Sequence, residues 1–298
     1  PAAKIERSNG SLLTTLGMTR FCTRLAMLFA VSAPAIADSQ ITSYAGSLDG
    51  LYANSHLIVV SGEALLVDAQ LTRSDARGVV DMIEKSAAEL KLIFITHAHP
   101  DHYLGLESLS RAFPRARIFS SQGTAIAIAG NGQAARRFWR ERLGDDIADS
   151  VIVPDVIQAT RLTLGDESIR LIDLSDGESK ASAVLYVPAR QWLFSGDLVF
   201  SGVHPWLVDN RARAWRQNLQ RLRDLGTFAK IYPGHGEAGD HGLLERNTTY
   251  LKRFSEAARA ADDAKNMFDR VNDLYPSYRL PHLLRLSAEA VMNARGRR

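Results

Sequence analysis

Short apolar runs and turn residues alternate along the first third of the chain. Runs at residues 55–60 and 64–67 flank Ser61-Gly62, a dipeptide typical of the turn of a β-hairpin. Apolar residues then recur at helical spacing over residues 73–86. They lead into a strand predicted at 92–96, whose residues 92–95 are all apolar. The pattern therefore predicts a hairpin, then a helix, then a buried strand.

The same alternation continues to the end of the chain. Gly130 and Gly132 interrupt the helical pattern of residues 124–143 and predict two helical pieces there. The tail, residues 264–298, predicts two further helices broken at its prolines. The pattern predicts the remaining helices at 104–113, 212–225 and 243–261, and the remaining strands at 117–120, 151–153, 161–164, 169–174, 183–187, 192–195 and 230–232.

Two strand-rich halves, each with its own helices, are typical of one α/β domain whose sheets pack on each other. We find no internal repeat, low-complexity segment or long linker in the sequence that would divide it. We expect a leader at residues 1–37, a main domain at 38–262 and a C-terminal helical extension at 263–298.

The expected leader has the pattern of a secretory signal peptide. A positively charged segment begins at Met18, an apolar run follows at 25–31, and small residues at 35–37 form a cleavage site. The apolar run is too short for a membrane span, and Pro34 interrupts it. We therefore expect removal of the leader, a periplasmic or secreted protein, and no stable membrane insertion afterwards.

Removal of this leader changes the charge and the cysteine content. The 298 residues contain 36 Lys and Arg and 33 Asp and Glu, with 46% hydrophobic and 23% charged residues. Without residues 1–37, basic and acidic residues balance, so charge gives no reason to expect a nucleic-acid partner. Cys22, the only cysteine, would leave with the leader, which would exclude disulfides and a thiol nucleophile.

A cluster of metal-ligand residues follows the apolar strand that ends near residue 95. His97, His99, Asp101 and His102 lie within six positions. Imidazole and carboxylate groups form a donor set that suits zinc, and four of them on one strand-to-loop turn can converge on a point. The cluster therefore predicts a metal site.

Three other turns carry candidate ligands, each after a predicted strand. They place Asp197 after Gly196, His235 between two glycines, and Glu178 in the segment 175–179. Glycine lets the backbone bend close to a ligand, which leaves the neighbouring side chain free to point at a metal. Each turn alone is a weak signal, but together with the cluster they predict one shared site.

In their order and spacing, residues 96–102, Gly196-Asp197 and residues 233–236 resemble the metallo-β-lactamase superfamily of dinuclear hydrolases, over about residues 43–260. The resemblance implies a four-layer αββα sandwich with two Zn²⁺ ions at one edge, between the sheets. It also implies roles for the individual ligands. His97 and His99 would bind the first metal, Asp101, His102 and His235 the second, and Asp197 would bridge the two.

Glu178 departs from the family pattern. The family usually has a histidine in this turn as third ligand of the first metal, whereas this chain has Gly177-Glu178-Ser179. One interpretation makes Glu178 an oxygen ligand, as in the Gly-Glu-Thr turn of the alkyl sulfatases of the superfamily. The other makes it a solvated loop residue beside a crippled first site, and Asp176 is a weaker substitute. We favour ligation, because a carboxylate is a competent zinc donor.

An ionised Glu178 would make the two-metal site electrically neutral instead of positive. We therefore expect weaker metal binding at the first site and a wider choice of metal, including manganese or iron.

The resemblance implies hydrolysis of a small-molecule substrate. A metal-bridging hydroxide would attack an ester, thioester, lactone or related bond, and Asp101 would orient it. His204, seven residues beyond Asp197, is a candidate acid for the leaving group or a substrate contact; a loop histidine with no role is the alternative. Trp206 and Tyr232 either form an apolar wall or simply pack. We interpret three isolated histidines as structural: His56, His241 and His282.

Other functions stay open at this stage. Asp197 argues against a main β-lactamase activity, because true β-lactamases of the superfamily generally lack this bridging aspartate. An alkyl sulfatase-like hydrolase and a mononuclear iron enzyme of the persulfide dioxygenase type are the alternatives within the superfamily. A non-catalytic metal-binding module is the third class. Substrate identity and oligomeric state do not follow from these motifs, since loops such as 130–149 and 201–211 would determine the substrate.

Overall fold

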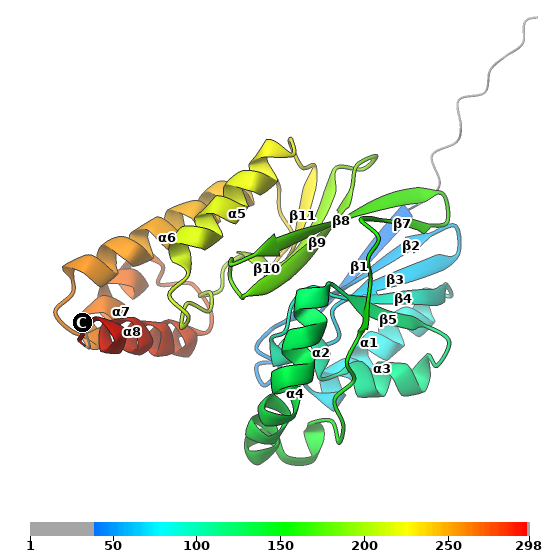
Figure 1. Cartoon of the computed structure of the whole chain (residues 1–298), viewed down its shortest axis with the longest axis horizontal. Helices are drawn as coiled ribbons and strands as arrows, with labels where there is room; N and C mark the ends of the chain where they lie inside the picture. Colours follow the sequence, from blue (N-terminus) through cyan, green and yellow to red (C-terminus); the bar gives the residue numbers. More distant parts are fainter. Residues whose placement is uncertain (1–38, 297–298) are drawn as a thin grey trace, which may run out of the picture. The chain divides into compact units, whose positions relative to one another are not determined.

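The computed structural model describes residues 39–296, which form two β-sheets with helices outside them (Figure 1). The expected leader at residues 1–37 lies outside the described residues. The first sheet has six strands in the order β1-β2-β3-β4-β5-β6, and the second has five in the order β11-β10-β9-β8-β7. The strands of the first sheet are β1 (Ser39–Ala45), β2 (Asn54–Val60), β3 (Glu63–Val67), β4 (Glu89–Ile95), β5 (Arg117–Ser120) and β6 (Asp155–Val156).

The first sheet combines a hairpin with parallel strands. β1, β2 and β3 pair antiparallel, whereas β3, β4, β5 and β6 pair parallel. Because successive side chains of a strand point to opposite faces, Leu57 and Ile58 of β2 pack in two different hydrophobic clusters. Both faces of this sheet are therefore buried, which explains the nearly continuous apolar runs of its central strands.

The second sheet is antiparallel except at one edge, where β10 and β11 pair parallel. Its inner face meets the first sheet in a shared hydrophobic cluster that includes Phe94 of β4 and Phe194 of β10. The strands of this sheet are β7 (Arg161–Leu164), β8 (Glu167–Ser175), β9 (Ala181–Val187), β10 (Trp192–Phe200) and β11 (Lys230–His235).

Helices cover the outer face of each sheet. Val79 and Leu109, from the helices against the first sheet, share a core cluster with Leu66 of β3. Trp215 and Phe254 do the same with β10 on the other side. The α/β class and the four-layer arrangement are thereby confirmed. The helices are α1 (Arg73–Lys85), α2 (Pro100–Tyr103), α3 (Leu106–Ala112), α4 (Gln122–Leu143), α5 (Ala212–Asp224), α6 (Gly242–Ala260), α7 (Ala264–Leu274) and α8 (Pro281–Gly296).

Two sequence-based expectations about elements were wrong. The predicted break at Gly130 and Gly132 is absent, and α4 is one helix of 22 residues. A glycine inside a helix costs about 1 kcal/mol relative to alanine, but it does not end the helix. Gly132 faces Val151 and Tyr103, where a Cβ atom would lie only 2.8 Å from Val151 Cγ1. The strand predicted at 151–153 is irregular; the short β6 lies further along, at Asp155–Val156.

The C-terminal helices α7 and α8 belong to the same core as α5 and α6. Met267, Val271, Leu284 and Ala288 are fully buried in the cluster that covers the second sheet. Among residues 39–296, no helix is both long and apolar enough to cross a membrane.

Candidate metal centre

The segment after β4 brings four of the predicted ligands to one edge of the first sheet. His97 forms an isolated β-bridge with Ser182 of β9, so this segment contacts the second sheet directly. Pro100 then starts α2, where its fixed φ suits the first helical position and its missing N–H costs no hydrogen bond. The short helix turns Asp101 and His102 back toward the strand ends.

The second sheet supplies the other three ligands, each from a different turn or strand end. Glu178 lies in the turn between β8 and β9, which closes through a hydrogen bond from Gly177 N to Ser179 O (3.0 Å). Asp197 lies in β10 where the pairing with β11 is irregular. His235 is the last residue of β11. A Cβ atom at Gly234 would lie 1.9 Å from Asp197 Oδ1, so only glycine fits beside this carboxylate.

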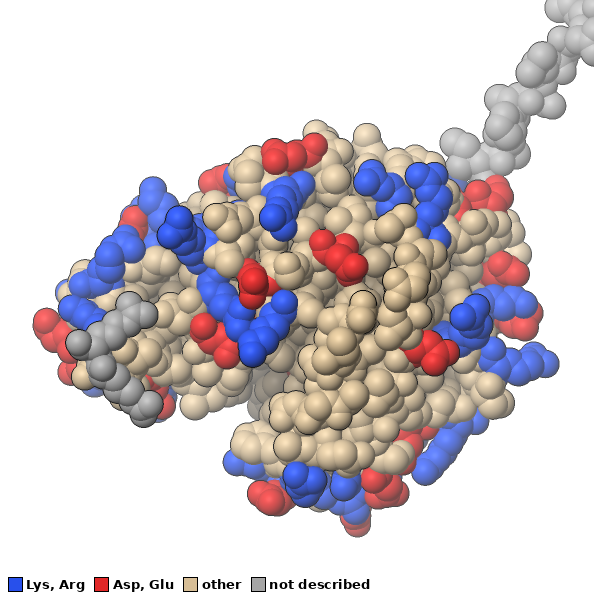
Figure 2. Space-filling view, in the orientation of Figure 1, with Lys and Arg blue, Asp and Glu red and all other residues tan. Residues whose placement is uncertain are grey.

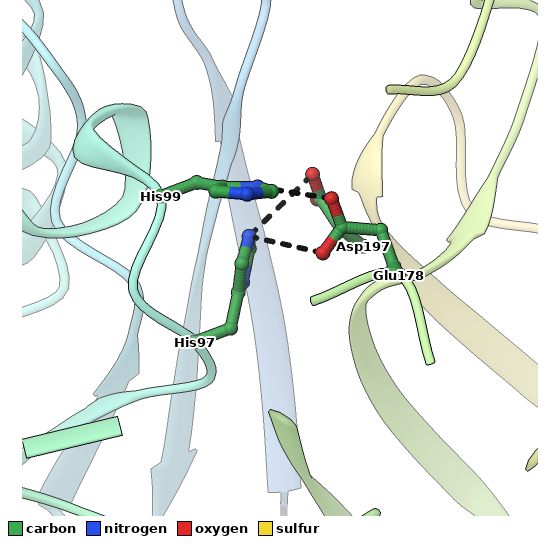
Figure 3. A group of neighbouring side chains, drawn as sticks. All are labelled: His97, His99, Glu178 and Asp197. Carbon is green, nitrogen blue, oxygen red and sulfur yellow. Dashed lines mark ion pairs between the residues drawn. The ribbon is translucent and has the colours of Figure 1, made fainter. Parts of the chain in front are cut away.

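His97, His99, Glu178 and Asp197 form a first group, in which ligand atoms point toward one another (Figure 3). His97 Nε2 lies 3.7 Å from Glu178 Oε2 and 3.6 Å from Asp197 Oδ2. His99 Nδ1 lies 2.9 Å from Glu178 Oε1. The structure thus brings Glu178 into the group, with 2% of its surface exposed, and not out into solvent.

Asp101, His102 and His235 form a second group. His235 Nε2 lies 3.3 Å from Asp101 Oδ2 and also 3.3 Å from His102 Nε2. The side chains of all three residues are almost completely buried.

Asp197 lies between the two groups. Its Oδ2 is 3.6 Å from His97 Nε2 and 3.4 Å from His235 Nε2, and its Oδ1 is 3.2 Å from His102 Nε2. One carboxylate therefore reaches histidines of both groups, which is the position that a bridging ligand needs.

The outer nitrogen of three of these imidazoles is already held by a neighbour. His102 Nδ1 lies 2.9 Å from Asp68 Oδ2, His235 Nδ1 lies 2.9 Å from Leu51 O, and His97 Nδ1 lies 3.0 Å from Thr96 Oγ1. Such partners fix the ring orientation and leave Nε2 free to bind a metal. His102 and His235 each donate their Nδ1–H to an oxygen.

The sequence analysis missed Asp68. This buried carboxylate accepts hydrogen bonds from Thr96 N (2.8 Å) and Thr96 Oγ1 (2.9 Å) as well as from His102. It thereby fixes the start of the ligand-bearing loop and one ligand together. The signal was present, since Asp68 directly follows the apolar strand 64–67, as the other carboxylates follow theirs.

Burial and mutual charge set the protonation of the first group. Burial raises the pKa of Glu178 to about 7, although the nearby His99 opposes the shift. Burial lowers the pKa of His99, but the charges of Glu178, Asp101 and Asp197 outweigh it and raise that pKa to about 9. Protons therefore compensate part of the negative charge that this group would otherwise concentrate.

Several buried atoms of the site have no hydrogen-bond partner among the described residues: His97 Nε2, both carboxylate oxygens of Glu178, and Asp197 Oδ1. The 2.9 Å contact from His99 to Glu178 is an ion pair without hydrogen-bond geometry. A buried polar atom without a partner costs about 1–3 kcal/mol, so a native structure rarely keeps four of them together. Metal ions bound by the two groups would give these atoms a partner, so the residues present fit a metal.

A model of the metallo-β-lactamase superfamily matches residues 48–235, which is more than half of the chain. The chain belongs to this superfamily. The matched segment includes all seven candidate ligands.

The curated relatives that the chain matches include two different kinds of enzyme. The chain is 29% identical to a hydroxyacylglutathione hydrolase of Actinobacillus pleuropneumoniae serotype 3 over 162 residues, covering 54% of this chain and 58% of that protein. It is 26% identical to a metallo-β-lactamase type 2 of Bacillus cereus over 204 residues, covering 67% and 73%. The chain thus spans less than two thirds of the hydroxyacylglutathione hydrolase.

Solved structures support the fold. A metallo-β-lactamase from Pontibacter korlensis superposes with a TM-score of 0.57 and 22% identity, covering 72% of this chain and 99% of that one. The resemblance expected from the motifs is confirmed at the level of family and fold.

A cavity of about 430 Å³ opens onto the candidate metal centre. Its floor includes His99, Asp101, Asp197 and His235. Both segments expected to determine the substrate, 130–149 and 201–211, supply lining residues. Trp206 is one of them, and its ring lies 6.4 Å from the ring of His99 in an edge-on arrangement.

Tyr232 and Asp176 do not line the cavity, and neither does His204. The side chain of His204 is fully buried, and its Nδ1 lies 2.7 Å from the Tyr250 hydroxyl. His282 of α8, which the sequence analysis interpreted as structural, does line the cavity. A lone surface histidine in the tail gave no signal for that position, because the contact depends on how α8 packs.

Proposed function

We propose that this chain is a dinuclear metal-dependent hydrolase that cleaves an ester, thioester, lactone or related bond. The observation that carries the proposal is the pair of ligand groups that share Asp197 at the floor of an open cavity. Two complete groups also favour this function over a mononuclear iron enzyme of the persulfide dioxygenase type, which needs only one.

In this proposal His97, His99 and Glu178 hold one ion, Asp101, His102 and His235 hold the other, and Asp197 contacts both. The donor set suits zinc, and the three carboxylates also suit manganese or iron. Bound zinc would supply the acidity that ionises a water near neutral pH and the positive charge that polarises a carbonyl.

The protein's own groups orient the reaction. Burial raises the pKa of Asp101, but His102 and His235 outweigh burial and lower that pKa to about 2, so the carboxylate is ionised at neutral pH. An ionised Asp101 can accept a hydrogen bond from the attacking water and hold it toward the substrate carbonyl. The attacking water gives up one proton to solvent and its oxygen bonds to the acyl carbon. The bond between the acyl carbon and the leaving group then breaks, and the leaving group takes up a proton from solvent. Because His204 lies away from the cavity, we give it no part in this step.

We also propose that the protein is exported to the periplasm or secreted. The support is the signal-peptide pattern at residues 18–37. The balance of 32 basic and 32 acidic residues without the leader agrees with a small-molecule substrate and not a nucleic acid.

The first test measures metal and activity on the same preparations. Protein loaded with zinc, manganese or iron is analysed for metal per chain and assayed with chromogenic esters, thioesters, lactones, sulfates and phosphates. We expect two ions per chain and hydrolysis of at least one carboxylic ester, thioester or lactone.

Asp197→Asn should lower kcat by at least 100-fold and reduce the metal content. Asp176→Asn is the matched control, because this exposed aspartate lies in the Glu178 turn but pairs with Arg211 at 2.8 Å, away from the ligands. Two ions with sulfate esters as the best substrates would favour the alkyl sulfatase-like alternative. Metal binding without turnover of any substrate would favour a binding module.

A further inference from the structure

The cavity above the metal-ligand residues has apolar walls. Apart from the ligand residues and Pro100, its lining includes Leu51, Ala135, Phe138, Trp139, Phe200, Trp206, Leu283 and Leu286. Its volume of about 430 Å³ falls within the range of small-molecule pockets, about 300–1,000 Å³. A molecule bound here would have one end at the candidate metal centre and the rest against aromatic and aliphatic side chains.

Two helices far apart in sequence form the opposite walls. α4 supplies Phe138 and Trp139, and α8 supplies Leu283 and Leu286. Figure 2 shows the surface hollowed between the part that carries the C-terminal helices and the part that carries α4, with few charged side chains inside the hollow. α8 lies beyond the segment that matches the superfamily model, so one wall comes from outside that segment.

Both walls expose large apolar side chains to water. Phe138 is 47% exposed and Leu286 is 44% exposed, although both line the cavity. Exposed apolar side chains grouped around a pocket are typical of a binding site, because a ligand would remove them from water.

The lining offers little to an anionic substrate. Arg142 is the one Lys or Arg among the lining residues, and its guanidinium lies 3.4 Å above the Phe138 ring and donates to Phe138 O at 2.7 Å. With two divalent ions bound, the carboxylates of Asp101, Asp197 and Glu178 would be neutralised. Away from that centre, His282 and Arg142 are the lining residues that could carry a positive charge, so a carboxylate at the far end of a substrate would meet mainly apolar surface.

We propose that this cavity binds an uncharged substrate whose acyl part is an extended alkyl or aryl group, held between Phe138 of α4 and Leu286 of α8. The proposal rests on the proposed hydrolase function and adds the class of substrate. It makes Phe138 and Leu286 specificity residues, and it makes the C-terminal extension part of the substrate site.

A series of 4-nitrophenyl esters tests the chain length and the charge. We expect kcat/KM to rise at least tenfold from the acetate to the octanoate. Complete burial of each added methylene would raise kcat/KM by about fourfold at most. The monoester of octanedioic acid has the same number of carbons and a terminal carboxylate, and we expect it to react at least tenfold more slowly than the octanoate. Equal or faster reaction of this anionic ester would overturn the proposal.

Variants test whether Phe138 and Leu286 cause the preference for the longer acyl chain. Phe138→Ser and Leu286→Ser should each lower the octanoate-to-acetate ratio of kcat/KM by at least fivefold. Ile126→Ser on α4 and Leu274→Ser on α7 are matched controls, because both residues are exposed large hydrophobics outside the cavity lining. The ratio should not change in either control.

A binding measurement on metal-free protein separates the pocket from the chemistry. We expect the neutral fluorescent probe N-phenyl-1-naphthylamine to bind saturably, and Phe138→Ser and Leu286→Ser to weaken its binding at least fivefold. Ester hydrolysis without chain-length preference and without probe binding would overturn the apolar pocket and leave the hydrolase function standing. Probe binding that depends on Phe138 and Leu286, with no hydrolysis of any ester, thioester or lactone, would support the pocket and contradict the hydrolase function.

Discussion

Glu178 is a carboxylate in the turn where the resemblance led us to expect a histidine, and its Oε1 lies 2.9 Å from His99 Nδ1. A carboxylate binds a divalent ion through oxygen and adds a negative charge to a buried site that already contains Asp197 and Asp101. Burial raises the pKa of Glu178 to about 7, although His99 opposes the shift, because an ionised carboxylate is costly to bury. A bound cation would offset that cost.

Replacing Glu178 by glutamine should separate these two effects. Glu178→Gln removes the charge and leaves a weaker donor, so we expect at least tenfold weaker binding of one ion per chain, measured by equilibrium dialysis and metal analysis. The melting temperature of the metal-free variant should rise above that of the metal-free wild type, since the variant no longer buries an ionisable carboxyl group.

Glu178→His, which restores the usual family ligand, should keep two ions per chain, and so should the control Asp176→Asn. Unchanged affinity in Glu178→Gln would show that Glu178 does not bind the first metal. Equal loss of both ions on mild chelation of the wild type would contradict the expected weaker binding at the first site.

His204 is a buried histidine whose pKa is shifted by burial. Burial lowers its pKa to about 4, and the ring packs against Tyr250 and Tyr278. In the unfolded chain the pKa would be about 6.5, so above that pH the ring is neutral in both states and contributes nothing. As the pH falls from 6.5 toward 4, only the unfolded chain takes up the proton, and the folded state loses stability.

His204→Asn should therefore reduce the acid sensitivity of the fold. Between pH 7.5 and pH 5.0, we expect the free energy of unfolding of the wild type to fall by about 2 kcal/mol more than that of the variant, from a difference of about 2.5 pKa units. Urea denaturation of the metal-free proteins measures this difference.

Tyr250→Phe keeps the buried imidazole and should keep the wild-type pH dependence. An unchanged pH dependence in His204→Asn would show that the folded protein accommodates the charged ring.

At the residue scale, the sequence predicted the seven ligand candidates because each follows a strand end in a turn that contains glycine or histidine. His204 also follows a strand in such a turn, but its side chain lies away from the cavity. Its loop turns it under α6, toward Tyr250, and no pattern within the loop indicates that direction. Asp68 and His282 were missed for the complementary reason, since one acts through a neighbour and the other reaches the cavity only through tertiary packing.

At the scale of elements, strands and amphipathic helices followed from periodicity, and the exceptions have local causes. α4 continues through Gly130 and Gly132 because the helix is fixed by its contacts, and Gly132 is needed where Val151 approaches. Val151 and Ile152 pack against the cluster that includes Ile128 of α4, without strand pairing, whereas Val153 is exposed. A run of three apolar residues is therefore too short to specify a strand.

α8 offers a direct comparison between core and surface on one helix. Leu284 is fully buried and Leu286, two residues later, is 44% exposed. We expect Leu284→Ala to lower the free energy of unfolding by about 2–5 kcal/mol, because it removes core contacts and leaves a cavity. Leu286→Ala should cost about 1 kcal/mol or less.

Chemical denaturation of both variants measures the difference. If α8 were a loosely attached appendage, Leu284→Ala would cost as little as Leu286→Ala. The cavity would then lack a fixed second wall.

At the scale of the whole molecule, the pairing of the strands determines where the ligands meet. The first sheet contributes His97, His99, Asp101 and His102 from the end of β4, and the second contributes Glu178, Asp197 and His235 from three other turns. The order of strands within each sheet does not follow from periodicity, because any strand with two buried faces can pair with any other. The turns at the strand ends predicted one shared site, but the assignment of each ligand to one of two metals came only from the resemblance to a known family.

Because the ligands come from both sheets, a bound metal would cross-link the two halves of the fold. Ions that bind only the folded state stabilise it by about 2.7 kcal/mol per site at a concentration 100 times the dissociation constant. For a domain of this size, two such sites should raise the melting temperature by about 10 °C or more. Dipicolinate should therefore lower the melting temperature by that amount, and added zinc should restore it.

The variant that tests this effect is Asp197→Asn, which should lose most of the rise in melting temperature on adding zinc. Asp197 reaches both ligand groups, because its carboxylate lies near His97 and His102 of the first sheet. Asp176→Asn should keep the full response. A melting temperature that chelation does not change would mean that the sheets hold together without ions. The gathered side chains would then have to be stabilised by their own protons, shared between Glu178 and His99 at neutral pH.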